Sequence, residues 1–212
     1  MCASLVEELK VDSDLKCRIA REAATLLYFG FEKEYKQAKL KAAQTCGIHF
    51  LPSNLEVALE LDKLAEEKEG SVRTERLIQM RKEALRIMKI LKACRPLLIG
   101  SVWRGTIRRG SDIDIAVYHD VAAEIVDLLK AHGFQVSKTE WTRVTKKGVT
   151  EISFHIHVET LNEQKIEVVV RGSEEAGRKR KCEIFGDEIR GLNVQELEKL
   201  LKENPSQRFI PF

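Results

Sequence analysis

In the first 70 residues, apolar and charged positions alternate at the three- to four-residue spacing of amphipathic helices. Residues that interrupt this pattern stand at Gly30, Gly47, Pro52 and Gly70. Pro52 cannot continue a helix, and Ser53 or Asn54 can cap the one that follows. The N-terminal third is therefore predicted to be helical, with three amphipathic helices separated by these breaks.

A further helix is predicted over 71–94, because the residue before Pro96 leaves helical space. Beyond Pro96 the pattern changes to short apolar runs that are typical of strands. We predict strands over 97–99, 113–117, 134–144, 150–158 and 166–170, helices over 121–131 and 192–203, and turns over 146–148 and 161–164. The order predicts an α+β protein, with a helical domain over 1–70 and a second domain over 71–212.

Composition and charge add limits to this picture. Hydrophobic residues make up 43% of the 212 residues, which is enough for a sizeable core, and the net charge of +3 permits a nucleic-acid partner without demanding one. The five cysteines are scattered, form no Cys-x-x-Cys pair, and favour a reducing compartment. With no signal peptide and no apolar run of membrane-spanning length, we expect a cytoplasmic protein with no membrane partner.

The chemistry is concentrated between residues 97 and 118. An apolar run breaks at Gly100 and Ser101, a basic loop follows, and Asp112 and Asp114 open the next run. Two residues apart on a strand, these carboxylates share one face, and their repulsion is relieved by a hard dication such as Mg²⁺. Gly100 allows a tight turn close to a ligand, and the N–H groups of a helix starting at Ser101 favour phosphate. This is the equipment of phosphoryl or nucleotidyl transfer.

At these residues the chain resembles the polymerase-beta-like nucleotidyltransferase superfamily, which carries Gly-Ser, a spacer and Asp-x-Asp on the next strand. Arg104-Gly-Thr and Ser111-Asp-Ile-Asp are most similar to archaeal CCA-adding enzymes. The resemblance covers roughly residues 85 to 171 and leaves out the N-terminal third. It implies a mixed β-sheet flanked by helices, with a third metal carboxylate on the strand beside Asp-x-Asp. Glu167 has that place, where the family more often has Asp, and Glu159 is the alternative.

The resemblance also implies roles for individual residues. Asp112, Asp114 and Glu167 would hold two Mg²⁺ ions, with Mn²⁺ as a substitute. The nucleotide would be bound by Gly100, Ser101, Arg104 and Arg109. The expected reaction is transfer of a nucleoside monophosphate from an NTP such as ATP to a hydroxyl acceptor, with an RNA end as the first candidate, and release of pyrophosphate.

Several alternatives stay open at the level of sequence. The domain could be a non-catalytic nucleotide-binding or regulatory module, or could nucleotidylate a protein or small molecule as a toxin–antitoxin component. His155 and His157 share a strand face, where they could bind a metal or line a cleft, and Trp103 and Trp141 could stack on a base or sugar. The basic run 178–181 could follow an RNA backbone or be solvated surface. The N-terminal helices could be a scaffold or a homo-oligomer contact. The NTP, the acceptor and the oligomeric state are not fixed.

Overall fold

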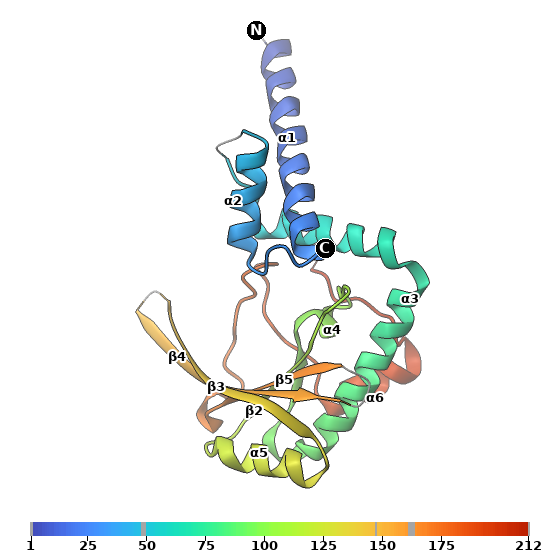
Figure 1. The fold of residues 1–212 in the computed structure, drawn as a ribbon, viewed down its shortest axis with the longest axis vertical. Helices are drawn as coiled ribbons and strands as arrows, with labels where there is room; N and C mark the ends of the chain where they lie inside the picture. Colours follow the sequence, from blue (N-terminus) through green and yellow to red (C-terminus); the bar gives the residue numbers. More distant parts are fainter. Residues whose placement is uncertain (1, 48–49, 147, 161–163, 212) are drawn as a thin grey trace. The chain divides into compact units, whose positions relative to one another are not determined.

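The computed structural model describes residues 2–47, 50–146, 148–160 and 164–211 (Figure 1). By its contacts the chain divides into two compact units. One contains the residues up to Arg73 together with Cys182–Gly186, and the other contains Thr74–Lys181 together with the residues from Asp187 onward. The two-domain boundary expected at Gly70–Ser71 stays a prediction, and each unit is described on its own.

The first unit is helical, as predicted. It contains α1 (Cys2–Tyr28), α2 (Tyr35–Thr45) and the first part of α3 (Asn54–Ile90). Ser53 and Glu56 cap α3 reciprocally: the Glu56 N–H donates to Ser53 Oγ at 3.1 Å, and the Ser53 N–H donates to the Glu56 carboxylate at 2.6 Å. The core is rich in alanine, with Ile19, Leu27 and Val57 as its larger members. None of the helices in the described part of the chain is long and apolar enough to cross a membrane.

The helix break predicted at Gly70 is confirmed. The element α3 consists of two helical segments, one ending at Gly70 and the next continuing to Ile90. Gly70 has φ 52° and ψ −135°, a conformation that a residue without a Cβ adopts at little cost. A 3-10 turn (Lys92–Cys94) and the left-handed Arg95 (φ 50°) then lead into Pro96.

The second unit is built on a five-stranded sheet with the order β1-β2-β5-β4-β3. The strands are β1 (Leu97–Ile99), β2 (Ile113–Tyr118), β3 (Gln135–Lys146), β4 (Val149–Glu159) and β5 (Lys165–Arg171). β2 and β5 run parallel and the other neighbours antiparallel, so the predicted mixed sheet is confirmed. The turns predicted over 146–148 and 161–164 include residue 147 and residues 161–163, which lie outside the described residues.

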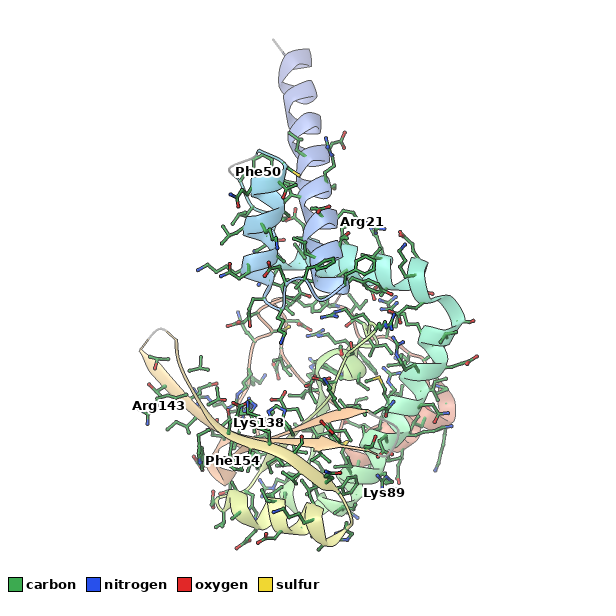
Figure 2. The ribbon with its side chains drawn as sticks, in the orientation of Figure 1. Arg21, Phe50, Lys89, Lys138, Arg143 and Phe154 are labelled. Atoms are coloured by element: carbon green, nitrogen blue, oxygen red, sulfur yellow. The ribbon has the colours of Figure 1, made fainter. Side chains whose placement is uncertain are left out.

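Helices cover one face of this sheet. The second part of α3, α5 (Ala122–Ala131) and α6 (Val194–Glu203) pack there (Figure 1), and their apolar side chains form one core with the sheet. The strand residues in this core are Ile113, Ile115, Val117, Ile156, Val158, Ile166, Val168 and Val170. Since neighbouring strand residues point to opposite faces, the residues between them lie on the other face. Figure 2 shows Phe154 and Lys138 on either side of the β3–β4 pair. The acids of β2 and β5 therefore lie on the face opposite the helices.

A buried arginine joins the helix layer to the short helix α4 (Gly100–Arg104). Arg81 is fully buried and donates to the backbone carbonyls of Val102 and Trp103 at 3.1 and 2.9 Å. It also donates to the carbonyls of Pro205 and Gln207 in the C-terminal tail, at 2.7 and 2.8 Å. Burial lowers the pKa of Arg81 to about 10. The guanidinium therefore satisfies carbonyls at the end of α4 and ties the tail to the same place.

Candidate active site

Two acids that lie far apart in the sequence meet across β2 and β5. Asp114 and Glu167 are direct partners in the parallel pairing of these strands. Asp112 immediately precedes β2, two residues from Asp114. Because Ile113 and Ile115 are buried in the helix-facing core, all three carboxylates belong to the opposite face. The structure thus brings together the three acids that the sequence singled out.

The electrostatics of these acids reflect their closeness. Burial raises the pKa of Asp114 to about 8, and the charges of Glu167 and Asp112 add to this effect. Asp114 also shares a hydrogen bond with Glu167, which a protonated Asp114 can donate. Burial likewise raises the pKa of Asp112, although the nearby Lys165 ammonium acts in the opposite direction. The site therefore favours a proton or a cation over three free carboxylates.

Gly100, the first residue of α4, lies in contact with Asp114. Its φ is 70°, in the left-handed region, and a Cβ built on it would overlap the Asp114 carboxylate. A glycine is therefore required here both by its backbone conformation and by the space beside it. Ser101 follows in the first turn of α4, and its carbonyl accepts from Thr106 N–H at 3.0 Å. The predicted phosphate-binding turn and the acids are thus neighbours.

The donor chemistry of the site fits a hard dication. Three carboxylates without a sulfur ligand match the preference of Mg²⁺ for oxygen, and the absence of a Cβ on Gly100 gives the Asp114 carboxylate its space. In the arrangement described, Asp114 bonds to Glu167, and Glu167 bonds to His155. Within residues 2–47, 50–146, 148–160 and 164–211, no three His, Cys, Asp or Glu side chains are arranged to hold a metal ion. Metal binding would therefore require Asp114 to release its hydrogen bond to Glu167.

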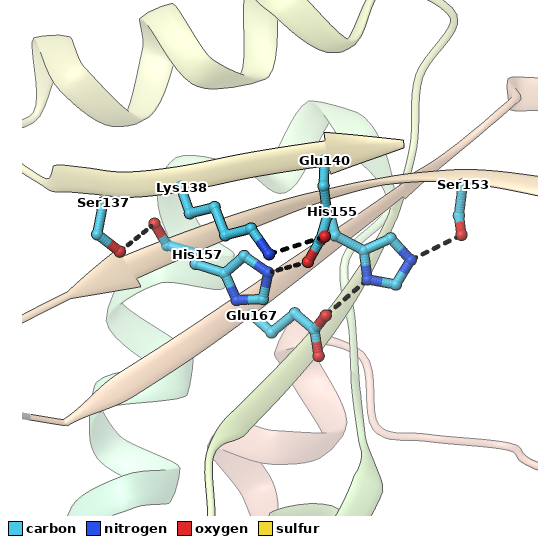
Figure 3. A network of polar contacts seen from close by, with 7 residues as sticks. All are labelled: Ser137, Lys138, Glu140, Ser153, His155, His157 and Glu167. Carbon is cyan, nitrogen blue, oxygen red and sulfur yellow. Dashed lines mark hydrogen bonds and ion pairs between the residues drawn. The ribbon is translucent and has the colours of Figure 1, made fainter. Parts of the chain in front are cut away.

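The two histidines of β4 bind acids rather than each other (Figure 3). His155 Nδ1 lies 2.6 Å from Glu167 Oε1, and His155 Nε2 lies 2.8 Å from Ser153 Oγ. His157 Nε2 instead lies 3.0 Å from Glu140 Oε1 on β3. The two histidines thus lie on a polar face of the sheet, as expected, and each imidazole is bonded to a carboxylate.

Arg104 is placed differently from its expected role in nucleotide binding. Its side chain is only 4% exposed, and it donates two hydrogen bonds to the Asp187 carboxylate at 2.6 and 3.1 Å. A third bond, of 3.1 Å, goes to the Phe209 carbonyl in the C-terminal tail. Arg104 therefore stabilises α4 from within, and we leave it out of the proposed nucleotide site. Arg109 is exposed on the loop that leads to β2.

Neither tryptophan lies where a base would stack beside the acids. Trp103 is buried in the core and stacks on Phe209 with a centroid distance of 6.4 Å. Trp141 is 68% exposed and packs on Phe154 at 4.8 Å. Trp141 and Phe154 line an open pocket of about 660 Å³ together with residues of α5, on the helix side of the sheet. The stacking role expected of Trp103 is wrong, because α4 turns this ring inward.

The basic run 178–181 is largely neutralised by acids. Arg178 and Arg180 form ion pairs with Glu151 and Glu175, and Lys179 pairs with Glu188 at 3.2 Å. These pairs favour the interpretation of this run as part of the protein surface over that of an RNA-binding track.

Sequence reasoning missed two features of this site. It did not pair His155 with Glu167, although both lie on alternating strands whose polar positions point to one face. It also missed Lys165, whose charge acts on Asp112. The signal for Lys165 was its position directly before the apolar run of β5, but using it required the parallel register of β2 and β5, which sequence alone did not provide.

Comparisons with known proteins cover this second unit. The family model described as "Nucleotidyltransferase domain" matches residues 82–205. Among solved structures, the Cid1 poly(U) polymerase with bound MgGTP is 19% identical, with a TM-score of 0.32, over 52% of this chain and 38% of that chain. A cytoplasmic RNA terminal U-transferase is 17% identical, with a TM-score of 0.34, over 51% and 35%. The chain therefore spans little more than a third of the length of these two chains.

A comparison with curated proteins finds no match. The similarity to archaeal CCA-adding enzymes stays a prediction, whereas the resemblance to the polymerase-beta-like nucleotidyltransferases is confirmed. The family match extends over more than half of the 212 residues and contains Gly100, Asp112, Asp114 and Glu167. The chain belongs to the nucleotidyltransferase domain family.

Proposed function

We propose that this protein is a metal-dependent nucleotidyltransferase that moves a nucleoside monophosphate from an NTP to a hydroxyl acceptor and releases pyrophosphate. One observation carries the proposal: Asp114 pairs directly with Glu167 across β2 and β5 and packs against Gly100 at the start of α4. This arrangement lies within the matched nucleotidyltransferase domain.

The acids have the central role in this proposal. Asp112, Asp114 and Glu167 would hold two Mg²⁺ ions, or Mn²⁺ in their place. When bound, the ions would supply neutralisation of the triphosphate and a lower pKa for the attacking hydroxyl. Asp114 must give up a proton to act as a ligand, because its pKa is raised to about 8.

The remaining contacts would come from the start of α4 and from the loop that follows this helix. The backbone at Gly100 and the Ser101 hydroxyl would bind the terminal phosphates, directly beside the acids. Arg109, exposed on the loop, would contribute positive charge to the triphosphate. We leave Arg104 out of the proposed site, because its guanidinium is bonded to the Asp187 carboxylate.

For the acceptor we propose the hydroxyl at an RNA end, in keeping with the resemblance that the sequence shows. The free cysteines among the described residues (Cys17, Cys46, Cys94 and Cys182) are compatible with a cytoplasmic location, which is part of the same proposal. A homo-oligomer formed through the N-terminal helices stays a prediction.

A labelling experiment tests the proposal. The protein is incubated with Mg²⁺, each α-labelled NTP in turn and total cellular RNA, and the labelled macromolecule is identified by nuclease or protease digestion. We expect label on RNA and equimolar pyrophosphate. The matched control is the double variant Asp112→Asn/Asp114→Asn, which retains volume and loses charge. Label on protein would replace the RNA acceptor by a protein, and full turnover by the double variant would refute the site.

A further inference from the structure

Glu167, the third acid of the site, is hydrogen-bonded to His155 on β4, and His155 is bonded in turn to Ser153 on the same strand. His155 is 18% exposed and Glu167 27% exposed, so the bond between His155 Nδ1 and Glu167 Oε1, at 2.6 Å, is partly shielded from water. The other ring nitrogen, Nε2, lies 2.8 Å from Ser153 Oγ. Both nitrogens of one imidazole are therefore engaged, and Figure 3 shows the ring between its two partners.

The direction of these bonds follows from the chemistry of the groups. A carboxylate can only accept, so Nδ1 carries the proton and donates to Glu167. In a neutral ring Nε2 is then the acceptor, and the Ser153 hydroxyl donates to it. Ser153 thereby fixes both the tautomer and the plane of the ring that contacts the acid.

The strand register shows that this contact is selective. The residue directly opposite Glu167 on β4 is His157, whereas His155 lies diagonally, opposite Val169. His157 turns toward β3 and bonds Glu140 at 3.0 Å, and Glu140 in turn accepts from Lys138 Nζ at 2.8 Å. Two histidines on one face therefore serve two different acids, and only His155 touches the acid of the site (Figure 3).

The long Glu167 side chain needs a partner such as His155 to hold it in one conformation. Glutamate has one more rotatable bond than aspartate, and a metal ligand must be held in one conformation to bind well. A ring bonded to one carboxylate oxygen removes that freedom and leaves the second oxygen for a cation. Partners that orient a metal-ligating side chain typically change metal affinity or activity about 10- to 100-fold when removed.

We propose that His155, held by Ser153, is a positioning residue that orients the Glu167 carboxylate toward the cation site. This inference rests on the proposed function, because it assigns Glu167 to a metal. It explains how a glutamate can serve at a position where a shorter acid is expected.

The test measures Mn²⁺ affinity by calorimetry for the full chain and four variants: His155→Ala, His155→Asn, Ser153→Ala and His157→Ala. His155→Ala removes the donor, and we expect about a 10- to 100-fold weaker Mn²⁺ affinity. Asn carries its amide N–H near the place of Nδ1, so His155→Asn should recover most of the loss. Ser153→Ala should cause a smaller loss, and His157→Ala should stay within about threefold of wild type because its ring bonds Glu140.

Turnover of NTP is measured on the same variants, with thermal unfolding as the check on folding. A purely space-filling role for His155 predicts equal behaviour of the Ala and Asn variants, and this result would overturn the proposal, as would unchanged Mn²⁺ affinity in His155→Ala. If the wild-type chain binds no Mn²⁺, the positioning role is refuted together with the metal site. If it binds Mn²⁺ with the predicted ranking but transfers no nucleotide, the proposed function fails and the positioning role stands.

Discussion

Replacing Gly100 by alanine should reduce nucleotidyl transfer far more than it reduces the stability of the fold. Gly100 has φ 70°, and a Cβ at this position would overlap the Asp114 carboxylate. The variant Gly100→Ala therefore imposes two costs, a strained backbone and a displaced acid. Gly110, in the same loop region, has φ 79° and nothing within 4 Å of its Cβ position. Gly110→Ala imposes the strain alone and is the matched control.

The size of each effect follows from the geometry. The left-handed conformation costs alanine about 1–2 kcal/mol, so both variants should lose a similar free energy of unfolding. The Asp114 carboxylate must in addition move by on the order of 1 Å to clear the new methyl group in Gly100→Ala. A misplacement of that size can cost about 100-fold in rate, which corresponds to about 2.7 kcal/mol of transition-state stabilisation.

The assay compares urea unfolding with kcat/KM for nucleotidyl transfer in the two variants. We expect similar losses of stability, near-normal turnover in Gly110→Ala, and a loss of about 100-fold in Gly100→Ala. Equal turnover in both variants would show that the contact between Gly100 and Asp114 has no bearing on the reaction. A much larger loss of stability in Gly100→Ala would show that the turn mainly supports the fold.

Three further predictions concern Asp114 and the residues that support the site. In EDTA, the free energy of unfolding should fall as the pH rises from about 5 to 8, because Asp114 keeps its proton up to about pH 8 in the folded protein and loses it near its ordinary pKa of 3.8 in the unfolded chain. Asp114→Asn should flatten this slope in thermal unfolding, and an unchanged slope would exclude Asp114 as its source. Arg81→Met should lower the free energy of unfolding by about 2–4 kcal/mol in urea, because four carbonyls lose their donor; a loss below about 1 kcal/mol would contradict the anchoring role. Asp187→Asn should lower the free energy of unfolding by about 1–3 kcal/mol, because Arg104 stabilises α4 through its bond to Asp187. The KM for the NTP should stay within about twofold, and a large rise in KM would indicate that Arg104 binds the nucleotide.

Much of the second unit could be predicted because its strands alternate cleanly. Apolar residues at every second position of β2, β4 and β5 fixed which side chains enter the core, and the acids had to lie on the other face. The capping signal at Ser53 likewise marked where a helix begins. These features depend on neighbours in the sequence, where periodicity carries the information.

Contacts between segments that are far apart in the sequence could not be predicted. The partner of Arg104 is Asp187, and the ring that covers Trp103 belongs to Phe209, both far along the chain. A motif identifies Arg104 and Trp103 as loop residues beside the acids, but it does not show that α4 turns them inward. The bond between His155 and Glu167 could not be predicted either. The sheet face of each residue was predictable, but the diagonal pairing across β4 and β5 was not.

If the proposed site is correct, Asp112, Asp114 and Glu167 bind a divalent cation beside Gly100. The most direct measurement is a crystal structure with Mn²⁺ and a non-hydrolysable NTP analogue, in which anomalous scattering locates the metal. We expect Mn²⁺ bound to oxygens of all three acids, with the analogue's phosphates at Gly100 and Ser101. Manganese bound elsewhere, or Glu167 outside its coordination sphere, would contradict it.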